Sequence, residues 1–233
     1  MKEEKKMSST KEYWQKNIEA FGKFYDQTSE ENIIASPILV PLYRKIIFPL
    51  EKKVTLGRYT KTVDFIDKNV KPGMIAVDLG CGTGVFTVEL LLKGAKVLAV
   101  DYVEQALSLT EKRVKEMMPQ LADRVDYLLL DIMEKPLPKS DIVIAIGVTP
   151  YVNTEGIFLD HILPTTNEFY CLFLNKWHWA NLLRNYIKFL NVRKYYFFDD
   201  KILEMALLKY NFRRISREIC GTGFLDTMKR IEP

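Results

Sequence analysis

The sequence predicts a doubly wound α/β fold, with one mostly parallel, seven-stranded sheet, helices on both faces and an N-terminal helical cap. From residue 74 onward, short apolar runs alternate with stretches of helical periodicity. Most of these runs are apolar at nearly every position, which is typical of parallel strands buried on both faces. The expected strands are MIAVDL, KVLAVD, VDYLLLD, DIVIAIG, EFYCLFLN, FRRISREI and GTGFLDTMKR, with the last two paired at the sheet edge.

Three helical stretches are expected before the first strand. The first begins near Ser9, which has the spacing of a capping box with Glu12. Its apolar stripe consists of Trp14, Ile18, Phe21 and Tyr25. The second, SPILVPLYRKIIFPLEKKV, is interrupted by prolines, and the third is RYTKTVDFIDKNV. We therefore expect a cap or lid at residues 1–70 and an α/β domain at residues 71–233.

Composition indicates an ordinary globular protein. The 233 residues suffice for one well-buried domain, and the chain is 48% hydrophobic and 27% charged. The charged start has no export signal, and no apolar stretch approaches the roughly 20 residues of a membrane span. The three cysteines lie far apart without a C-x-x-C pair, which fits a cytoplasmic location and argues against a disulfide framework or a zinc site. We expect no metal.

A glycine motif follows the first strand of the α/β repeat. In VDLGCGTGVF, residues 77–86, Gly80, Gly82 and Gly84 stand at every second position. The first suits a sharp turn, the second lets a ligand approach the backbone, and the third lets a helix pack closely. Val85 stands where a nicotinamide-binding G-x-G-x-x-G would end in glycine, and the G-K-[ST] of a P-loop is absent.

Acidic residues at the strand ends indicate which ligand the motif binds. Asp78 would repel a pyrophosphate but suits an ammonium or sulfonium group. Asp101 ends the second strand about 20 residues further on, where an acid accepts hydrogen bonds from ribose hydroxyls. Asp131 ends the third strand and can accept from an adenine amino group, with Ile132 against the ring. These acids favour S-adenosylmethionine over a dinucleotide.

The segment from Pro72 to about Ile146 resembles class I S-adenosylmethionine-dependent methyltransferases. KPGMIAVDLGCGTG matches their first motif, VLAVDYV the second, and LLLDIME and DIVIAIGV the next two. The flanking regions more distantly resemble small-molecule methyltransferases of the ubiquinone and magnesium-protoporphyrin type. The resemblance implies a Rossmann-like methyltransferase fold that binds S-adenosyl-L-methionine. The implied cofactor-binding residues are Tyr25, Asp78, Leu79, Gly80, Cys81, Gly82, Gly84, Asp101, Tyr102, Asp131, Ile132, Ile146 and Gly147.

The candidate catalytic residues are His178 and Tyr151. His178 lies between two tryptophans after the fifth strand, and Tyr151 follows the fourth. For Tyr151, as for Tyr25, ordinary packing is an equal alternative. We interpret Cys81 as a small apolar spacer rather than a nucleophile, and His161 as a surface or packing residue.

These features favour methylation of a small molecule, with oxygen of an acidic or phenolic acceptor preferred. A general base is needed only where the acceptor must lose a proton. One alternative is an RNA methyltransferase, because residues 175–217 contain ten Lys or Arg against three Asp or Glu, and residues 175–200 are also rich in aromatics. Another is a cofactor-binding regulator without catalysis. The stretch G-V-T-P-Y departs from the D/N-P-P-Y of amino methylation, which argues against a base N-methyltransferase.

We also expect the acceptor to lie under a lid. Only the N-terminal helices and the segment 177–198 lie outside the α/β repeat, so they are the candidates to cover the transferred methyl group. We expect a small-molecule substrate, no nucleic acid, no membrane span, and a monomer or homodimer.

Overall fold

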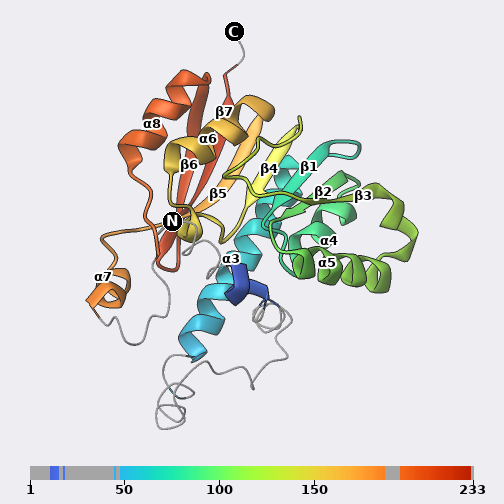
Figure 1. Cartoon of the computed structure of the whole chain (residues 1–233), viewed down its shortest axis with the longest axis horizontal. Coiled ribbons are helices and arrows are strands. Elements are labelled where there is room, and N and C mark those ends of the chain that lie inside the picture. Colours follow the sequence, from blue (N-terminus) through green and yellow to red (C-terminus); the bar gives the residue numbers. More distant parts are fainter. Residues whose placement is uncertain (1–10, 16–17, 19–44, 46–47, 187–194, 232–233) are drawn as a thin grey trace.

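A seven-stranded sheet forms the centre of the molecule (Figure 1). The computed structural model describes residues 11–15, 18, 45, 48–186 and 195–231. The strands are β1 (Ile75–Leu79), β2 (Lys96–Asp101), β3 (Val125–Leu129), β4 (Ile142–Ala145), β5 (Glu168–Leu174), β6 (Phe212–Cys220) and β7 (Gly223–Arg230). Their order is β3-β2-β1-β4-β5-β7-β6, and only β7 runs antiparallel to its neighbours. The predicted fold and the pairing of the last two strands at the edge are confirmed.

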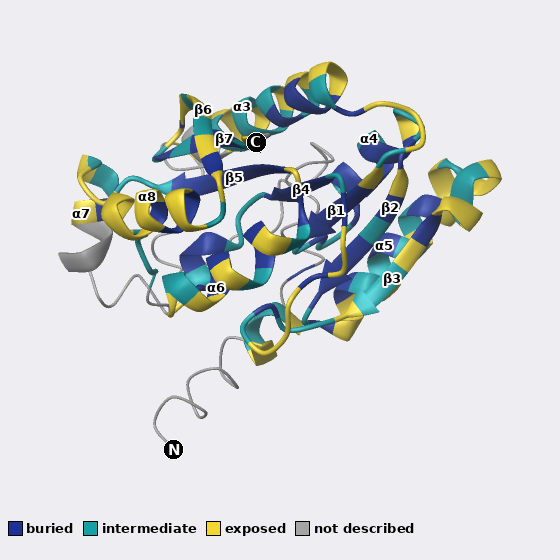
Figure 2. Ribbon diagram, turned by 90° about the horizontal axis from the view of Figure 1, so that it is seen from above, coloured by how far each residue is buried: buried dark blue, intermediate teal, exposed yellow. Residues whose placement is uncertain are grey.

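Helices cover both faces of this sheet. Figure 2 shows α3 and α4 on one side and α6 and α8 on the other. The helices are α3 (Phe48–Asn69), α4 (Val85–Leu92), α5 (Glu104–Met117), α6 (Glu155–Ile162), α7 (Trp179–Tyr186) and α8 (Asp200–Lys209). Among the described residues, none of the helices has the length and apolar character needed to cross a membrane.

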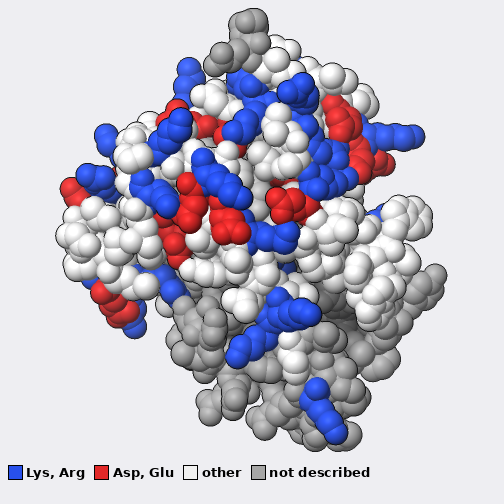
Figure 3. Space-filling model, turned by 180° about the vertical axis from the view of Figure 1, so that it is seen from behind, with Lys and Arg blue, Asp and Glu red and all other residues white. Residues whose placement is uncertain are grey.

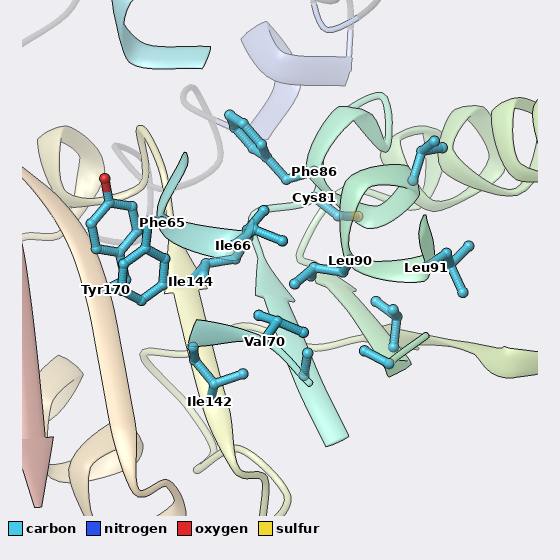
Figure 4. Close-up of a cluster of buried hydrophobic side chains, with 14 of the residues drawn as sticks. Phe65, Ile66, Val70, Cys81, Phe86, Leu90, Leu91, Ile142, Ile144 and Tyr170 are labelled. Atoms are coloured by element: carbon cyan, nitrogen blue, oxygen red, sulfur yellow. The ribbon is translucent and has the colours of Figure 1, made fainter. Parts of the chain in front are cut away.

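Strand residues alternate between two hydrophobic clusters. Ala76 of β1 belongs to the cluster with α3 and α4, and its neighbour Val77 belongs to the cluster with α6 and α8. Figure 4 shows the first cluster, in which Phe65 of α3 stacks on Tyr170 of β5 with ring centroids 3.8 Å apart. Both faces of the central strands are therefore buried, as the apolar runs indicate.

The second and third predicted helical stretches meet in one helix. α3 runs without a break for 22 residues. Pro49 is the second described residue of α3, and the helix continues from it to Asn69. Phe65 and Ile66 are 7% and 0% exposed. The end of the predicted cap is thus packed into the core of the α/β domain.

The first predicted helix is described only in part. Residues 11–15 are helical, and Trp14 and Ile18 pack against Val103 and Ala106 at the start of α5. The remainder of the predicted stripe, including Tyr25, lies outside the described residues.

Charges at the surface are paired rather than segregated. Figure 3 shows Lys and Arg interspersed with Asp and Glu over the upper part of the face seen there. Ion pairs join Lys61 to Glu218 and Lys93 to Asp67. In the β6–β7 hairpin, the fully buried Asp226 accepts hydrogen bonds from Nε and Nη2 of Arg217 at 2.8 and 2.7 Å.

Candidate functional site

The candidate site lies at the carboxyl edge of the sheet. The order β3-β2-β1 places three strand ends side by side. The glycine loop follows β1, Asp101 is the last residue of β2, and Asp131 follows β3. Ligands of doubly wound sheets bind beyond the carboxyl ends of the strands, where the strand order reverses, and β1 lies at that reversal. The topology therefore brings together the residues that the motifs single out.

The three loop glycines differ in what surrounds them. Gly80, Gly82 and Gly84 have φ of 73°, 59° and 77°. A Cβ at Gly80 would lie 2.5 Å from Cγ2 of Val148, and one at Gly84 would lie 2.8 Å from Cγ2 of Thr110. A Cβ at Gly82 would meet only the Gly80 carbonyl oxygen, at 3.9 Å. Two of the glycines thus permit close packing, and Gly82 leaves open space for a ligand.

Asp101 ties the loop to β2. Its Oδ2 accepts a hydrogen bond from the Gly82 N–H at 3.2 Å, and its Oδ1 accepts from the Val103 N–H at 3.0 Å. The side chain is buried, and burial raises its pKa to about 6. The Asp101 carboxylate therefore fixes the position of the backbone beside the open space at Gly82.

Asp78 faces the first turn of α4. Its Oδ2 accepts a hydrogen bond from the Thr87 hydroxyl at 2.7 Å. The side chain is 2% exposed, and burial, together with the nearby Asp101 charge, raises its pKa to about 7. A cation bound beside Asp78 would stabilise the ionised form.

The end of β3 places polar groups around a buried hydroxyl. Asp131 Oδ1 accepts from the Met133 N–H at 2.9 Å. The Tyr102 hydroxyl is buried and has no hydrogen-bond partner among the described residues. Burial, followed by the Asp101 and Asp131 charges, raises the pKa of Tyr102, so this hydroxyl is protonated and able to donate. An unpartnered buried donor beside two carboxylates is a position that a polar ligand can satisfy.

His161, interpreted above as a surface or packing residue, supports the segment that follows β3. His161 Nδ1 lies 2.7 Å from the carbonyl oxygen of Ile132, so α6 holds the segment after β3. Ile132 itself is 7% exposed. This contact joins residues 29 positions apart, and no local pattern in the sequence indicates it.

The remaining loop side chains are buried. Cys81 is 6% exposed, and its Sγ accepts from the Thr110 hydroxyl at 3.4 Å. Burial raises the pKa of this thiol well above its usual value, so it stays protonated and is a poor nucleophile. Leu79 is 3% exposed within the core beside β4 and β5. Leu79 can therefore reach a ligand only through its backbone.

Gly147 follows the end of β4, and the guanidinium of Arg58, which the sequence did not indicate as part of the site, lies close to it. Gly147 has φ of 91°, and a Cβ there would lie 3.9 Å from Nη1 of Arg58. Arg58 belongs to α3, some 90 residues earlier, and one arginine in a helical stretch gives no sequence signal. Ile146, just after β4, packs partly against the core that contains α3 and α4.

Tyr151 belongs to an aromatic cluster at this end of the sheet. Its ring lies edge-on to Trp14 at 5.2 Å and 5.9 Å from the Tyr195 ring, with a hydrogen bond between the two hydroxyls. Burial and then Tyr195 raise the pKa of Tyr151 well above its usual value. The Tyr151 hydroxyl is therefore protonated and neutral, and catalysis by Tyr151 stays a prediction.

His178 lies at the start of α7. Its Nδ1 accepts a hydrogen bond from the Ala180 N–H at 3.2 Å, and its ring stacks on Trp179. This contact caps the first turn of the helix. Catalysis by His178 stays a prediction. The described residues include no cluster of three or more His, Cys, Asp or Glu that could hold a metal ion.

Comparison with known proteins agrees with this geometry. Residues 77–167 match the family model of a methyltransferase domain. The chain is 34% identical over 85 residues to magnesium-protoporphyrin O-methyltransferase of Rhodobacter capsulatus, covering 36% of this chain and 37% of the relative. It is 26% identical over 136 residues to ribosomal protein L11 methyltransferase of Caldanaerobacter subterraneus subsp. tengcongensis, covering 51% and 43%. The chain thus matches less than half the length of these curated relatives.

A solved structure shares the fold over almost the whole chain. Magnesium protoporphyrin IX methyltransferase (ChlM) from Synechocystis PCC 6803, with SAH bound, aligns with a TM-score of 0.69 and 16% identity, covering 95% of this chain and 99% of that one. Residues 77–167 thus match a methyltransferase domain, and the chain has the fold and the glycine loop that are typical of class I S-adenosylmethionine-dependent methyltransferases. It is similar to small-molecule methyltransferases.

Proposed function

We propose that this protein transfers a methyl group from S-adenosylmethionine to an oxygen of a small acidic or phenolic acceptor. The observation that carries the proposal is the open space at Gly82 beside the buried Asp101 carboxylate. Asp101 can accept hydrogen bonds from ribose hydroxyls, and the nearby buried Asp78 would repel a pyrophosphate but suits a positively charged group. The residues present therefore fit S-adenosylmethionine.

Each part of the cofactor has a candidate partner. Asp101 would hold the ribose hydroxyls, and Asp131 would accept from the adenine amino group. Tyr102, with its buried donor, would complete this end of the site. Asp78 would stabilise the positive amino-acid end. When bound, the cofactor supplies a methyl carbon activated by the sulfonium, and the acceptor oxygen bonds to it while the C–S electron pair stays on sulfur.

The protein's contribution is to position the acceptor and exclude water. A carboxylate acceptor has no proton to lose, so it needs no general base. That agrees with Tyr151, which its environment keeps protonated. By its name, the Rhodobacter relative methylates an oxygen of a small molecule, which supports the same class of acceptor. The three cysteines are buried free thiols, and we propose a reducing, cytoplasmic setting for them.

Two measurements test the proposal. Calorimetry should show binding of S-adenosylmethionine and S-adenosylhomocysteine, with NAD binding much more weakly. Incubation with methyl-labelled S-adenosylmethionine and a cell extract should then place label in the small-molecule fraction. Label in RNA or protein would refute the proposed acceptor class, and tight cofactor binding without any transfer would indicate a regulator.

A further inference from the structure

We propose that Arg58 is a specificity-determining residue that binds a carboxylate of the methyl acceptor and so selects acids over phenols. This inference rests on the proposed function. Arg58 lies in the helical segment GRYTKTVDFI, before the cofactor motifs, and its position in the fold carries the argument.

Arg58 lies toward the β4 side of the sheet edge. The glycine loop, Asp101 and Asp131 lie at the ends of β1, β2 and β3, and Ile146 and Gly147, which the resemblance also assigns to the cofactor, follow β4. β4 is next to β1 on the opposite side, and Gly147 follows its end. Because Gly147 has no side chain, Nη1 of Arg58 lies over its backbone, 3.9 Å from where a Cβ would stand. An acceptor that approaches the methyl group from the β4 side therefore meets this guanidinium.

Contacts on both sides of Arg58 hold its helix across this edge. One turn earlier, Val54 packs so closely on the β6–β7 turn that a Cβ at Gly221 would lie 2.5 Å from its Cγ1. One residue later, Tyr59 donates a hydrogen bond to Glu89 and stacks on Phe86 at the start of α4. These contacts fix the backbone from which the guanidinium extends, as a binding residue requires.

An aromatic cluster lies within electrostatic range of Arg58. The positive charge of Arg58 acts on the Tyr151 hydroxyl, which belongs to the cluster with Trp14 and Tyr195. A guanidinium pairs with a carboxylate through two parallel hydrogen bonds, whereas a neutral phenol has one oxygen and no charge and cannot form this paired contact. One cation beside several rings thus suits an acid with an apolar, ring-bearing body.

The test uses three probe acids: biphenyl-4-carboxylate, indole-3-acetate and 4-phenylbutyrate. Their primary amides, 4-phenylphenol and phenyl phosphate are the comparison probes. Binding is measured by saturation-transfer NMR and calorimetry with saturating S-adenosylhomocysteine. We expect wild-type protein to bind at least one acid, and Arg58→Gln to bind it roughly 10- to 100-fold more weakly. Binding of the amides and the phenol should be the same in both proteins.

Matched variants separate the proposed role from general effects. Arg58→Lys keeps the charge without the paired donors and should be intermediate. Arg124→Gln, at an exposed arginine just before β3, should behave as wild type. Where Arg58→Gln fails to fold, Arg58→Lys carries the comparison.

Several outcomes would overturn the inference. These are failure of all three acids to bind, equal binding of the acid by Arg58→Gln, an equal loss for the amide, or preference for phenyl phosphate. Loss of S-adenosylhomocysteine binding in Arg58→Lys would place Arg58 on the cofactor instead. Failure of wild-type protein to bind S-adenosylhomocysteine would refute the proposed function, so the two failures are distinguishable.

Discussion

Alanine at Gly84 should mainly lower the stability of the fold, whereas alanine at Gly82 should mainly lower ligand affinity, although both residues belong to one loop. Both have positive φ, so a side chain at either costs about 1–2 kcal/mol of backbone strain. At Gly84, the new Cβ would also lie 2.8 and 3.0 Å from Cγ2 and Cα of Thr110. Because a backbone atom cannot yield easily, overpacking adds about 1–3 kcal/mol. Gly84→Ala should therefore lower the free energy of unfolding by about 2–5 kcal/mol, and Gly82→Ala by about 1–2 kcal/mol.

The loss of ligand affinity should follow the reverse order and be larger at Gly82 than at Gly84. A methyl group at Gly82 enters the open space where the cofactor is proposed to lie, and valine fills more of it. We expect Gly82→Ala to weaken S-adenosylhomocysteine binding at least tenfold and Gly82→Val to abolish it. Gly84→Ala should retain most of its affinity at temperatures where it is folded.

Urea unfolding and calorimetry measure the two quantities. Gly156→Ala is the matched control, because Gly156 is helical and a Cβ there would meet nothing within 4 Å. It should be neutral or stabilising by about 0.5–1 kcal/mol. If Gly82→Ala keeps wild-type affinity, or Gly84→Ala is as stable as this control, the assignment of the loop is wrong.

Three further results are expected. Asp101→Ala should weaken S-adenosylmethionine binding by about 1.5–3 kcal/mol in calorimetry, and Asp131→Ala by less, because apolar contacts also hold adenine; unchanged affinity in both would contradict the strand-end assignment. Burial raises the pKa of Asp101 from 3.8 to about 6, so the carboxylate is mostly protonated at pH 5, and affinity there should be about tenfold lower than at pH 8. In the free protein, the pKa of Asp78 is also raised, to about 7, so the folded state binds protons more tightly than the unfolded chain. The free energy of unfolding should therefore fall as pH rises from about 4 to 7. An affinity that does not change with pH, or a stability that rises over this range, would refute the raised pKa values of the two buried carboxylates. Asp226→Ala should lower the free energy of unfolding by about 1.5–3 kcal/mol in urea unfolding, because it removes the buried carboxylate that Arg217 binds while the pair with Asp200 remains, and it should leave cofactor affinity unchanged; a loss below about 1 kcal/mol would show that the pair contributes little.

The sequence predicted the sheet and the residues that the sheet brings together at the ends of β1, β2 and β3, because both depend on local patterns. Strands buried on both faces produce apolar runs, and the glycine spacing with Asp101 at a strand end reflects a turn between adjacent elements. The other part of the site depends on tertiary placement. Arg58 reaches the site because α3 crosses the sheet edge, and no nearby residue indicates that crossing. Prolines suggested an interrupted second helical stretch; Pro37 and Pro41 lie outside the described residues, and α3 continues from Pro49 to Asn69.

The hydrogen bonds of Asp101 to the Gly82 and Val103 N–H groups have a consequence for the thermodynamics of binding. The loop takes its shape when the chain folds, before any ligand arrives. Ordering a free backbone costs about 1–2 kcal/mol per residue. Because the loop is ordered during folding, this cost is included in the free energy of folding and not in the free energy of ligand binding. A variant with a loosened loop transfers the cost to the binding step, and its affinity should then fall more steeply with temperature than that of the wild type.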